Sequence, residues 1–190
     1  MLSHQKLESW RVKSLSDSVA YLFKIVFLGD PAVGKTSLVG RYVYDSFERD
    51  YLTTIGTDIH VKLVDLGDIS VKLVIWDIGG QDDFKQLRKA YYQNASGAFF
   101  VFDTTRPETL DRFDNWLGAL FEVTEKIPLV MCENKIDLVS EVSRDRVDKL
   151  VERYDIDFVR TSAKEDTNVE AAFTKMTKEM IERARKRKRV

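Results

Sequence analysis

The chain has 190 residues, of which 44% are hydrophobic and 32% are charged, a balance typical of one folded domain rather than of a disordered chain. The formal net charge of -1 excludes the strongly basic composition of a general nucleic-acid-binding protein. The sequence contains no apolar run approaching the roughly 18 residues that span a bilayer, and its start does not resemble a signal peptide. Together with a single cysteine, Cys132, expected to be a buried strand thiol, these features indicate a cytoplasmic protein without internal disulfides.

Strands and helices alternate in the pattern of apolar residues. Short apolar runs predict strands over residues 21–28, 58–66, 69–77, 97–103, 127–133 and 157–161. Amphipathic stretches predict helices over residues 36–44, 83–93, 107–122, 143–154 and 168–187. The segment 45–57 is expected to be a loop, and Gly67-Asp68 predicts a hairpin between the second and third strands. The alternation predicts an α/β protein of three layers, with a six-stranded, mostly parallel sheet, one antiparallel edge strand and helices on both faces.

Both ends of the chain differ in composition from this domain, which is predicted to cover residues 21–182. Residues 1–20 form a polar N-terminal extension, in which several apolar side chains between 7 and 22 could line one side of a helix. An interfacial membrane anchor is one interpretation of that pattern, and a flexible or self-docking extension is the favoured one. Residues 183–190 form a basic tail, interpreted either as a weak contact for anionic lipid or as a solvated helix end.

A phosphate-binding loop is predicted between the first strand and the first helix. The segment Gly29-Asp-Pro-Ala-Val-Gly34-Lys35-Thr36 matches the pattern G-x-x-x-x-G-K-[S/T] and stands in the strand-to-helix context that the pattern requires. The backbone N–H groups of such a loop surround an anion, and the helix N-terminus adds its positive end. Lys35 is expected to reach the terminal phosphates, and the Thr36 hydroxyl is expected to bind Mg²⁺. The predicted nucleotide contacts of this loop are Asp30, Ala32, Val33, Gly34, Lys35, Thr36 and Ser37.

Pro31 is the unusual residue of this loop. A proline removes one N–H donor and fixes φ, so the local geometry of the loop is expected to change. The donors from Ala32 to Thr36 remain, and phosphate binding is therefore expected to survive. The loop predicts the fold of P-loop nucleoside triphosphatases, whose ligands lie outside the carboxyl ends of the strands.

A second motif, Asn134-Lys135-Ile-Asp137, follows the fifth predicted strand and indicates guanine as the base. An aspartate carboxylate can accept two N–H bonds from guanine, whereas adenine would leave that carboxylate unpaired at a high cost. Asp137 is the candidate for this role, with the Lys135 stem along the base and Asn134 fastening neighbouring loops. After the last strand, Ser162-Ala163-Lys164 can supply a backbone N–H to the guanine oxygen. Each pattern is short, and their weight comes from their joint position after strands of one sheet.

With these motifs the chain resembles the Ras superfamily of small GTPases, and most of all its Rab branch, over nearly its whole length. The resemblance implies that Asp77, in Asp77-Ile-Gly-Gly80, holds Mg²⁺ through water and that the Gly80 N–H contacts the γ-phosphate. It implies that Gln81 orients the attacking water and that Thr54 ligates Mg²⁺ when the γ-phosphate is present. Phe47 stands where the family places an aromatic ring against guanine.

Alternatives remain open for two of these roles, because Thr53 could replace Thr54 and Gln81 could be an ordinary loop residue. Trp76 and Tyr91 match the aromatic effector surface of the family, or else serve core packing. The chain also departs from the Rab pattern. Gly79 stands where alanine is usual and forms a Gly-Gly pair that is more like the Arf branch, and Ile59 stands where phenylalanine is usual.

Lipid attachment is not expected, because no cysteine follows Cys132 for prenylation and Leu2 excludes N-myristoylation. We therefore expect a cytoplasmic protein whose contact with membranes, if it has one, is peripheral and does not depend on prenylation.

The function implied by the resemblance is that of a molecular switch that binds GTP or GDP with Mg²⁺ and slowly hydrolyses GTP, with Gln81, Lys35 and Thr54 as catalytic residues. GTP would order two switch loops, and an exchange factor, a GTPase-activating protein and effectors would read them together with Trp76 and Tyr91. The alternative is a GTP-binding interaction module with negligible hydrolysis, which Pro31 keeps open because it lies where a partner's arginine would enter. A nucleotide kinase or ATPase is less consistent, because the chain has no segment to spare for a lid and an acceptor site.

Overall fold

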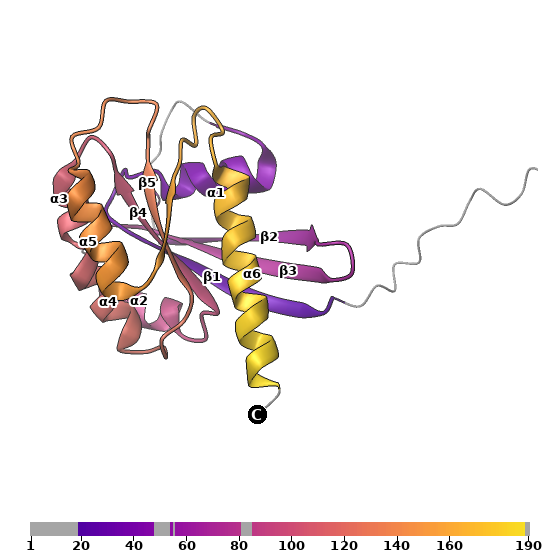
Figure 1. The fold of residues 1–190 in the computed structure, drawn as a ribbon. Helices are drawn as coiled ribbons and strands as arrows, with labels where there is room; N and C mark the ends of the chain where they lie inside the picture. The colour runs from indigo at the N-terminus through magenta and orange to yellow at the C-terminus, as the bar shows by residue number, and fades with distance from the viewer. Residues whose placement is uncertain (1–18, 48–53, 55, 81–84, 189–190) are drawn as a thin grey trace, which may run out of the picture.

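The computed structural model describes residues 19–47, 54, 56–80 and 85–188, and within them a six-stranded sheet in the order β2-β3-β1-β4-β5-β6 (Figure 1). The strands are β1 (Tyr21–Leu28), β2 (Thr57–Asp65), β3 (Ser70–Ile78), β4 (Gly97–Asp103), β5 (Leu129–Asn134) and β6 (Asp157–Arg160). The edge strand β2 runs antiparallel to β3, and every other neighbouring pair is parallel. The predicted fold class is therefore confirmed, including its single antiparallel edge strand.

The helices are α1 (Lys35–Tyr44), α2 (Lys85–Tyr92), α3 (Pro107–Asp111), α4 (Phe113–Phe121), α5 (Arg144–Tyr154) and α6 (Val169–Arg187). One predicted helix was wrong in extent, because the segment 107–122 forms two helices rather than one. Arg112 separates them with φ −84° and ψ 1°, outside the helical region, and its guanidinium pairs with Asp30 of the phosphate loop. The first of the two begins at Pro107, whose fixed φ suits the first helical position.

Each face of the sheet carries its own apolar core. Helices α1 and α6 cover one face, where Phe27 and Phe99 of the sheet stack and Phe173 of α6 packs against both. Helices α2 to α5 cover the other face, around Phe100 and Phe113. All of β4 is buried, and its side chains enter the two cores alternately, which is why its sequence is apolar up to the terminal Asp103. Cys132 of β5 lies in the first core and is 1% exposed, as predicted.

The C-terminal helix α6 contains the first part of the predicted basic tail. Its last turn carries Arg185, Lys186 and Arg187, where positive side chains interact favourably with the negative end of the helix dipole. Arg183 and Arg187 both contact Glu125. Within the described ranges, no helix is long and apolar enough to cross a bilayer. The N-terminal extension and its candidate amphipathic stretch lie almost entirely outside the described residues, which begin at Val19.

Candidate functional site

The loop between β1 and α1 is shaped by close backbone approaches. Gly29 has φ 131°, and a Cβ there would stand 2.2 Å from the carbonyl oxygen of Val101. Gly34 has φ 98°, and a Cβ there would stand 2.2 Å from Nδ2 of Asn134. Both positions therefore require glycine. Because α1 begins directly after the loop, the N-terminus of that helix faces the loop's hollow, which is an arrangement that favours anions.

Lys35 is folded back over this loop. Its ammonium donates to the carbonyl oxygens of Gly29, at 2.7 Å, and of Asp30, at 2.8 Å, and the residue is 5% exposed. A buried ammonium that donates to two neutral carbonyls retains its positive charge and its capacity to bind an anion. The Asp30 side chain points elsewhere, accepting a hydrogen bond from Trp116 Nε1 at 2.9 Å and lying 3.4 Å from Arg112 Nε. Asp30 can therefore contact a ligand through its backbone but not through its carboxylate.

Three oxygen-bearing side chains meet beside the loop. The Thr36 hydroxyl donates to Asp77 Oδ2 at 2.5 Å, and it lies 2.6 Å from the Thr54 hydroxyl. Asp77 is fully buried at the end of β3, and its Oδ1 has no hydrogen-bond partner among the described residues. Burial raises the pKa of Asp77, against the opposing effects of the Thr36 hydroxyl and the Lys35 charge. An unsatisfied buried carboxylate oxygen beside two hydroxyls fits a hard divalent cation such as Mg²⁺, which would favour the ionised carboxylate.

A cavity of about 390 Å³ opens at the carboxyl ends of the strands. Its lining comes from the phosphate loop, from the segment after α1, from the Asn134 motif and from the segment after β6. The lining residues are Ala32, Gly34, Ser37, Phe47, Asn134, Lys135, Asp137, Leu138, Ala163 and Lys164. Segments more than 100 residues apart in the chain, each singled out by its motif, therefore share one cavity. Leu138 is a lining residue that sequence reasoning missed, because an apolar residue after the motif carries no signal of its own.

Asn134 joins three parts of this site. Its Nδ2 donates to the Val33 carbonyl at 2.9 Å, and its Oδ1 accepts from the Thr161 hydroxyl at 3.2 Å and from the Ala163 N–H at 3.4 Å. The residue is 1% exposed, so these contacts are shielded from water. The amide thus links the phosphate loop to the segment after β6, which is the arrangement that its predicted fastening role requires.

The Asp137 carboxylate is held in place before any ligand binds. Its Oδ1 accepts a hydrogen bond from the Ser162 hydroxyl at 2.6 Å, and its Oδ2 lies 3.7 Å from Lys164 Nζ. The side chain is 12% exposed and its residue lines the cavity. Lys135, which precedes Asp137 in the same motif, places its ammonium 2.7 Å from Asp103 Oδ2. The acceptor that would read the base is therefore oriented, shielded and accessible from the cavity.

The remaining predicted residues lie around the loop or outside the described ranges. Gly80 is buried, and a Cβ there would stand 2.6 Å from Pro31 N, so this backbone packs directly on the phosphate loop. Gln81 and the alternative residue Thr53 lie outside the described residues. Trp76 and Tyr91 are half-buried with ring centroids 6.1 Å apart, and Lys24 Nζ lies 3.8 Å above the Trp76 ring.

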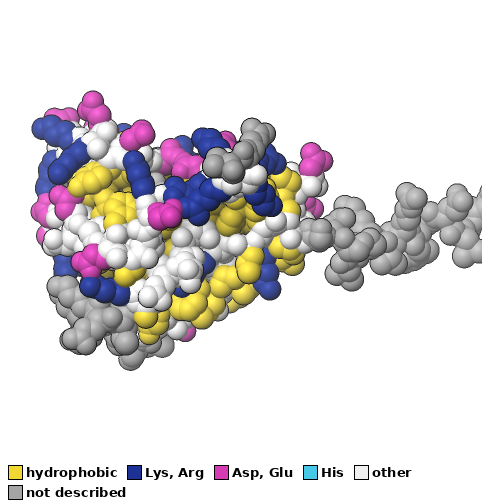
Figure 2. All heavy atoms as spheres, turned by 90° about the horizontal axis from the view of Figure 1, so that it is seen from below, with side chains coloured by type: hydrophobic (Ala, Val, Ile, Leu, Met, Phe, Trp, Pro, Cys, Tyr) yellow, Lys and Arg dark blue, Asp and Glu magenta, His cyan; other side chains and the backbone are white. Residues whose placement is uncertain are grey.

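Apolar side chains also reach the surface near this aromatic pair. Ile59, Val61 and Leu63 alternate along β2 and are at least half exposed, and Ile59 is the register partner of Trp76. Figure 2 shows a band of hydrophobic side chains along one edge of the molecule. An apolar surface next to a ligand site is typical of a protein-binding surface.

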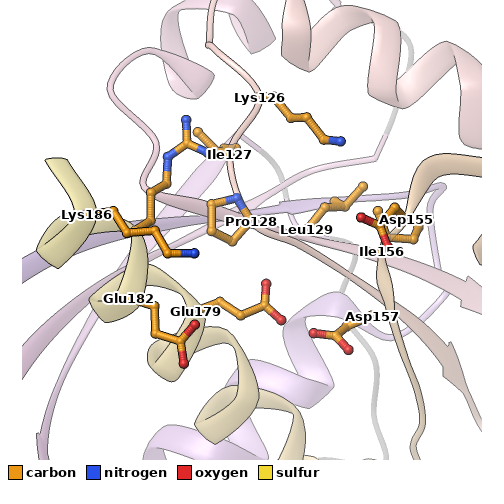
Figure 3. A pocket seen from close by; sticks show the side chains of 11 residues that line it. Lys126, Ile127, Pro128, Leu129, Asp155, Ile156, Asp157, Glu179, Glu182 and Lys186 are labelled. Carbon is orange, nitrogen blue, oxygen red and sulfur yellow. The ribbon is translucent and has the colours of Figure 1, made fainter.

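A second, larger cavity of about 560 Å³ lies at the amino ends of β5 and β6, beside the last turns of α6. Figure 3 shows Glu179, Glu182 and Asp157 in the lower part of the view, Lys186 next to Glu182, and Lys126 at the upper edge. None of the predicted site residues lines it. Since ligands of parallel sheets bind at the carboxyl ends of the strands, the smaller cavity is the candidate active site.

Comparison with known proteins identifies the family of the chain. A model of the Ras family matches residues 24–182. Ras-related protein Rab-8B of Pongo abelii is 37% identical over 164 residues, which cover 85% of this chain and 79% of that protein. Ras-related protein Rab-13 of Bos taurus is 34% identical over 164 residues, covering 85% and 81%, and Ras-related protein Rab-3 of Caenorhabditis elegans is 39% identical over 159 residues, covering 82% and 73%.

Proposed function

Since the chain belongs to the Ras family of small GTPases and stands close to the Rab branch, we propose that it is a molecular switch whose GTP-bound and GDP-bound states are distinguished by partner proteins. Family membership makes it a guanine-nucleotide-binding GTPase. The observation that carries the proposal is the shared cavity, where the phosphate loop meets Asp137 and the segment 163–164.

Base recognition is assigned to Asp137. Its carboxylate would accept the N1–H and the 2-amino group of guanine, while Ser162 keeps it oriented. The Ala163 backbone N–H, whose bond to Asn134 Oδ1 is long at 3.4 Å, would be shared with the guanine oxygen, and the Lys135 stem and the Phe47 ring would cover the faces of the base. Adenine offers neither donor, and the shielded carboxylate would remain unpaired, which excludes adenine energetically.

Charge neutralisation is assigned to the phosphate loop and Lys35. The N–H groups from Ala32 to Thr36 would surround the phosphates, and the Lys35 ammonium would exchange its carbonyl partners for phosphate oxygens. Thr36, Thr54 and Asp77 would hold Mg²⁺, which supplies charge stabilisation to the transferring phosphoryl group when bound. The buried, unsatisfied Asp77 Oδ1 supports this assignment.

The switch itself is assigned to the loops that carry Thr54 and Gln81. Thr54 contacts Thr36, so a ligand that engages both hydroxyls would order the loop around Thr54. Family membership implies that Gln81 would orient the attacking water, and Gln81 directly follows Gly80, whose backbone packs on the phosphate loop. Exchange factors, GTPase-activating proteins and effectors would bind these loops together with Trp76 and Tyr91. The basic residues after 182 would add a weak contact with anionic membranes.

A second candidate function is a GTP-binding interaction module with negligible hydrolysis, and Pro31 favours it. The Pro31 backbone packs against Gly80, whose N–H would contact the γ-phosphate, so the proline would stand beside the place where an incoming arginine would lie. Single-turnover release of phosphate from bound GTP separates the two functions, since only the switch enzyme releases it.

Two measurements test the main proposal. Calorimetric titration with GDP and with ADP should give strong binding to GDP alone, and a preference for ADP would refute the base assignment. The variant Gln81→Leu should slow single-turnover hydrolysis about 100-fold, as expected for loss of a group that positions the nucleophile, with little change in GDP affinity. Unchanged hydrolysis in this variant would remove Gln81 from the mechanism.

A further inference from the structure

Arg106 bridges the phosphate loop and the end of β4. One of its terminal nitrogens donates to the Pro31 carbonyl oxygen at 2.9 Å, and its Nε donates to Asp103 Oδ2 at 3.2 Å. Pro31 and Arg106 are 75 positions apart in the sequence. The role of Arg106 is not explained by base recognition, by Mg²⁺ binding or by the Lys35 contacts.

The peptide that Arg106 holds is one that needs support. It joins Pro31 to Ala32, and Ala32 has φ 61°, in the left-handed region that residues with a Cβ rarely adopt. Such a conformation persists only where the surroundings enforce it. Pro31 has no N–H, so its carbonyl oxygen is the backbone group through which a hydrogen bond can hold this residue.

The orientation of this peptide decides where a donor points. A trans peptide is planar and directs its C=O and N–H to opposite sides. Among the described residues, Ala32 lines the nucleotide cavity whereas Arg106 lies outside its lining. A bond that draws the Pro31 oxygen toward Arg106 therefore turns the Ala32 N–H away from Arg106, toward the cavity. Hydrogen bonding to a charged guanidinium also polarises the peptide and strengthens its N–H as a donor.

The arginine is itself firmly anchored. Asp103 is 1% exposed, and its Oδ1 accepts from the Thr105 N–H at 2.9 Å and from the Thr105 hydroxyl at 2.8 Å. Its Oδ2 also receives the Lys135 ammonium at 2.7 Å. Burial alone would raise the pKa of Asp103, but the hydrogen bonds from Lys135 and Thr105 outweigh it and lower that pKa. Asp103 therefore remains ionised at neutral pH and connects the guanidinium to the base-binding motif.

We propose that Arg106 is a positioning residue for the phosphates, which aims the Ala32 N–H at the terminal phosphate of a bound guanine nucleotide through its grip on the Pro31 carbonyl. The proposal rests on the proposed nucleotide site. The Arg106 contact would compensate for Pro31. The proline has no N–H that could fix the loop, and the bond from Arg106 to the Pro31 carbonyl fixes the next peptide instead. Asp103 makes this contact part of the same ionic cluster as Lys135.

The test compares GDP with GMP, which share the base and the first phosphate and differ in the phosphate that the loop surrounds. Both nucleotides are titrated into the full chain and into the variants Arg106→Ala, Arg106→Lys and Arg144→Ala. Arg144 is the matched control, since it pairs with Asp148 on the exposed face of α5, away from the cavity lining. Arg106→Ala should weaken GDP binding about tenfold and GMP binding by less than about twofold, as expected for loss of one oriented donor to a charged group.

Arg106→Lys should fall between the wild type and the alanine variant, because a single ammonium can keep one of the two contacts. Arg144→Ala should bind both nucleotides as the wild type does. Equal weakening of GDP and GMP by Arg106→Ala would overturn the proposal, since it would indicate a general loosening through Asp103 and Lys135. Unchanged GDP binding would overturn it as well.

If Arg106→Ala fails to fold, the lysine variant still tests the proposal, because it too must weaken GDP binding more than GMP binding. A wild-type chain that binds neither nucleotide would instead refute the proposed nucleotide site. The two failures are therefore distinguishable.

Discussion

The loss of the Asn134 side chain should weaken nucleotide binding and stability together. In Asn134→Ala three contacts disappear, of which the bond to the Val33 carbonyl at 2.9 Å is well formed and those to Thr161 and Ala163, at 3.2 and 3.4 Å, are longer. A buried polar group left without a partner costs about 1–3 kcal/mol. Val33 O and the Ala163 N–H are two such groups.

The cost for each of the two groups should stay near the lower end of that range. The Asn134 amide occupies space against Gly34, and both residues border the open cavity. Water can therefore enter the space left by the amide and rehydrate part of what is exposed. We expect a total loss of about 2–3 kcal/mol, shared between the free energy of unfolding and the free energy of GDP binding. Expressed wholly in affinity, this would be a weakening of about 30- to 150-fold.

Urea denaturation with and without saturating GDP separates the two contributions. The ligand-free transition reports the loss of stability, and the additional shift caused by GDP reports the remaining affinity. Asn115→Ala on the exposed side of α4 is the matched control and should leave both quantities unchanged to within about 0.5 kcal/mol. An Asn134→Ala protein whose stability and GDP affinity both match the wild type would refute the view that this amide ties the loops together.

Three further outcomes follow from the same geometry. Asp137→Ala should weaken GDP binding about 100-fold while leaving ADP binding as poor as before, measured by calorimetry; a loss shared equally by both would contradict its role in base selection. Gly29→Ala should cost more than about 3 kcal/mol or prevent folding, because its Cβ would stand 2.2 Å from the Val101 carbonyl oxygen; a thermal denaturation curve like that of the wild type would contradict this. Burial raises the pKa of the Cys132 thiol, so it should resist iodoacetamide at pH 8 until urea unfolds the chain, and rapid labelling of the folded protein would contradict its burial. Since only the unfolded chain then forms the thiolate, this residue's contribution to stability should be full below about pH 8.5 and decline above it.

Much of the fold could be predicted because local pattern and tertiary position agree. The run from Gly97 to Phe102 is apolar because both faces of β4 are buried, and this alone marks a central strand. The parallel order of the sheet then brings the carboxyl ends of β1, β5 and β6 to one edge. The motifs that follow these strands therefore had to meet, and they line one cavity.

What the sequence could not predict depends on side chains that meet without a local pattern. The break at Arg112 interrupts an otherwise helical stretch, and the pairing of its guanidinium with Asp30 has no signal in neighbouring residues. The bond from Arg106 to the Pro31 carbonyl joins two segments whose spacing is arbitrary in sequence. The unsatisfied Asp77 Oδ1 likewise becomes visible only when the surrounding atoms are in place.

The hydrogen bond between Trp116 and Asp30 makes the phosphate loop observable by light. The chain has three tryptophans, and the indole of Trp116 is 3% exposed with its N–H donating directly to a loop carboxylate. The fluorescence emission of that indole depends on this hydrogen bond and on the electric field of the neighbouring charges. Movement of Asp30 would therefore change the wavelength and the intensity of the Trp116 emission. With Trp10 and Trp76 replaced by phenylalanine, the intrinsic fluorescence of the unlabelled protein would follow the loop in real time as nucleotide enters and leaves.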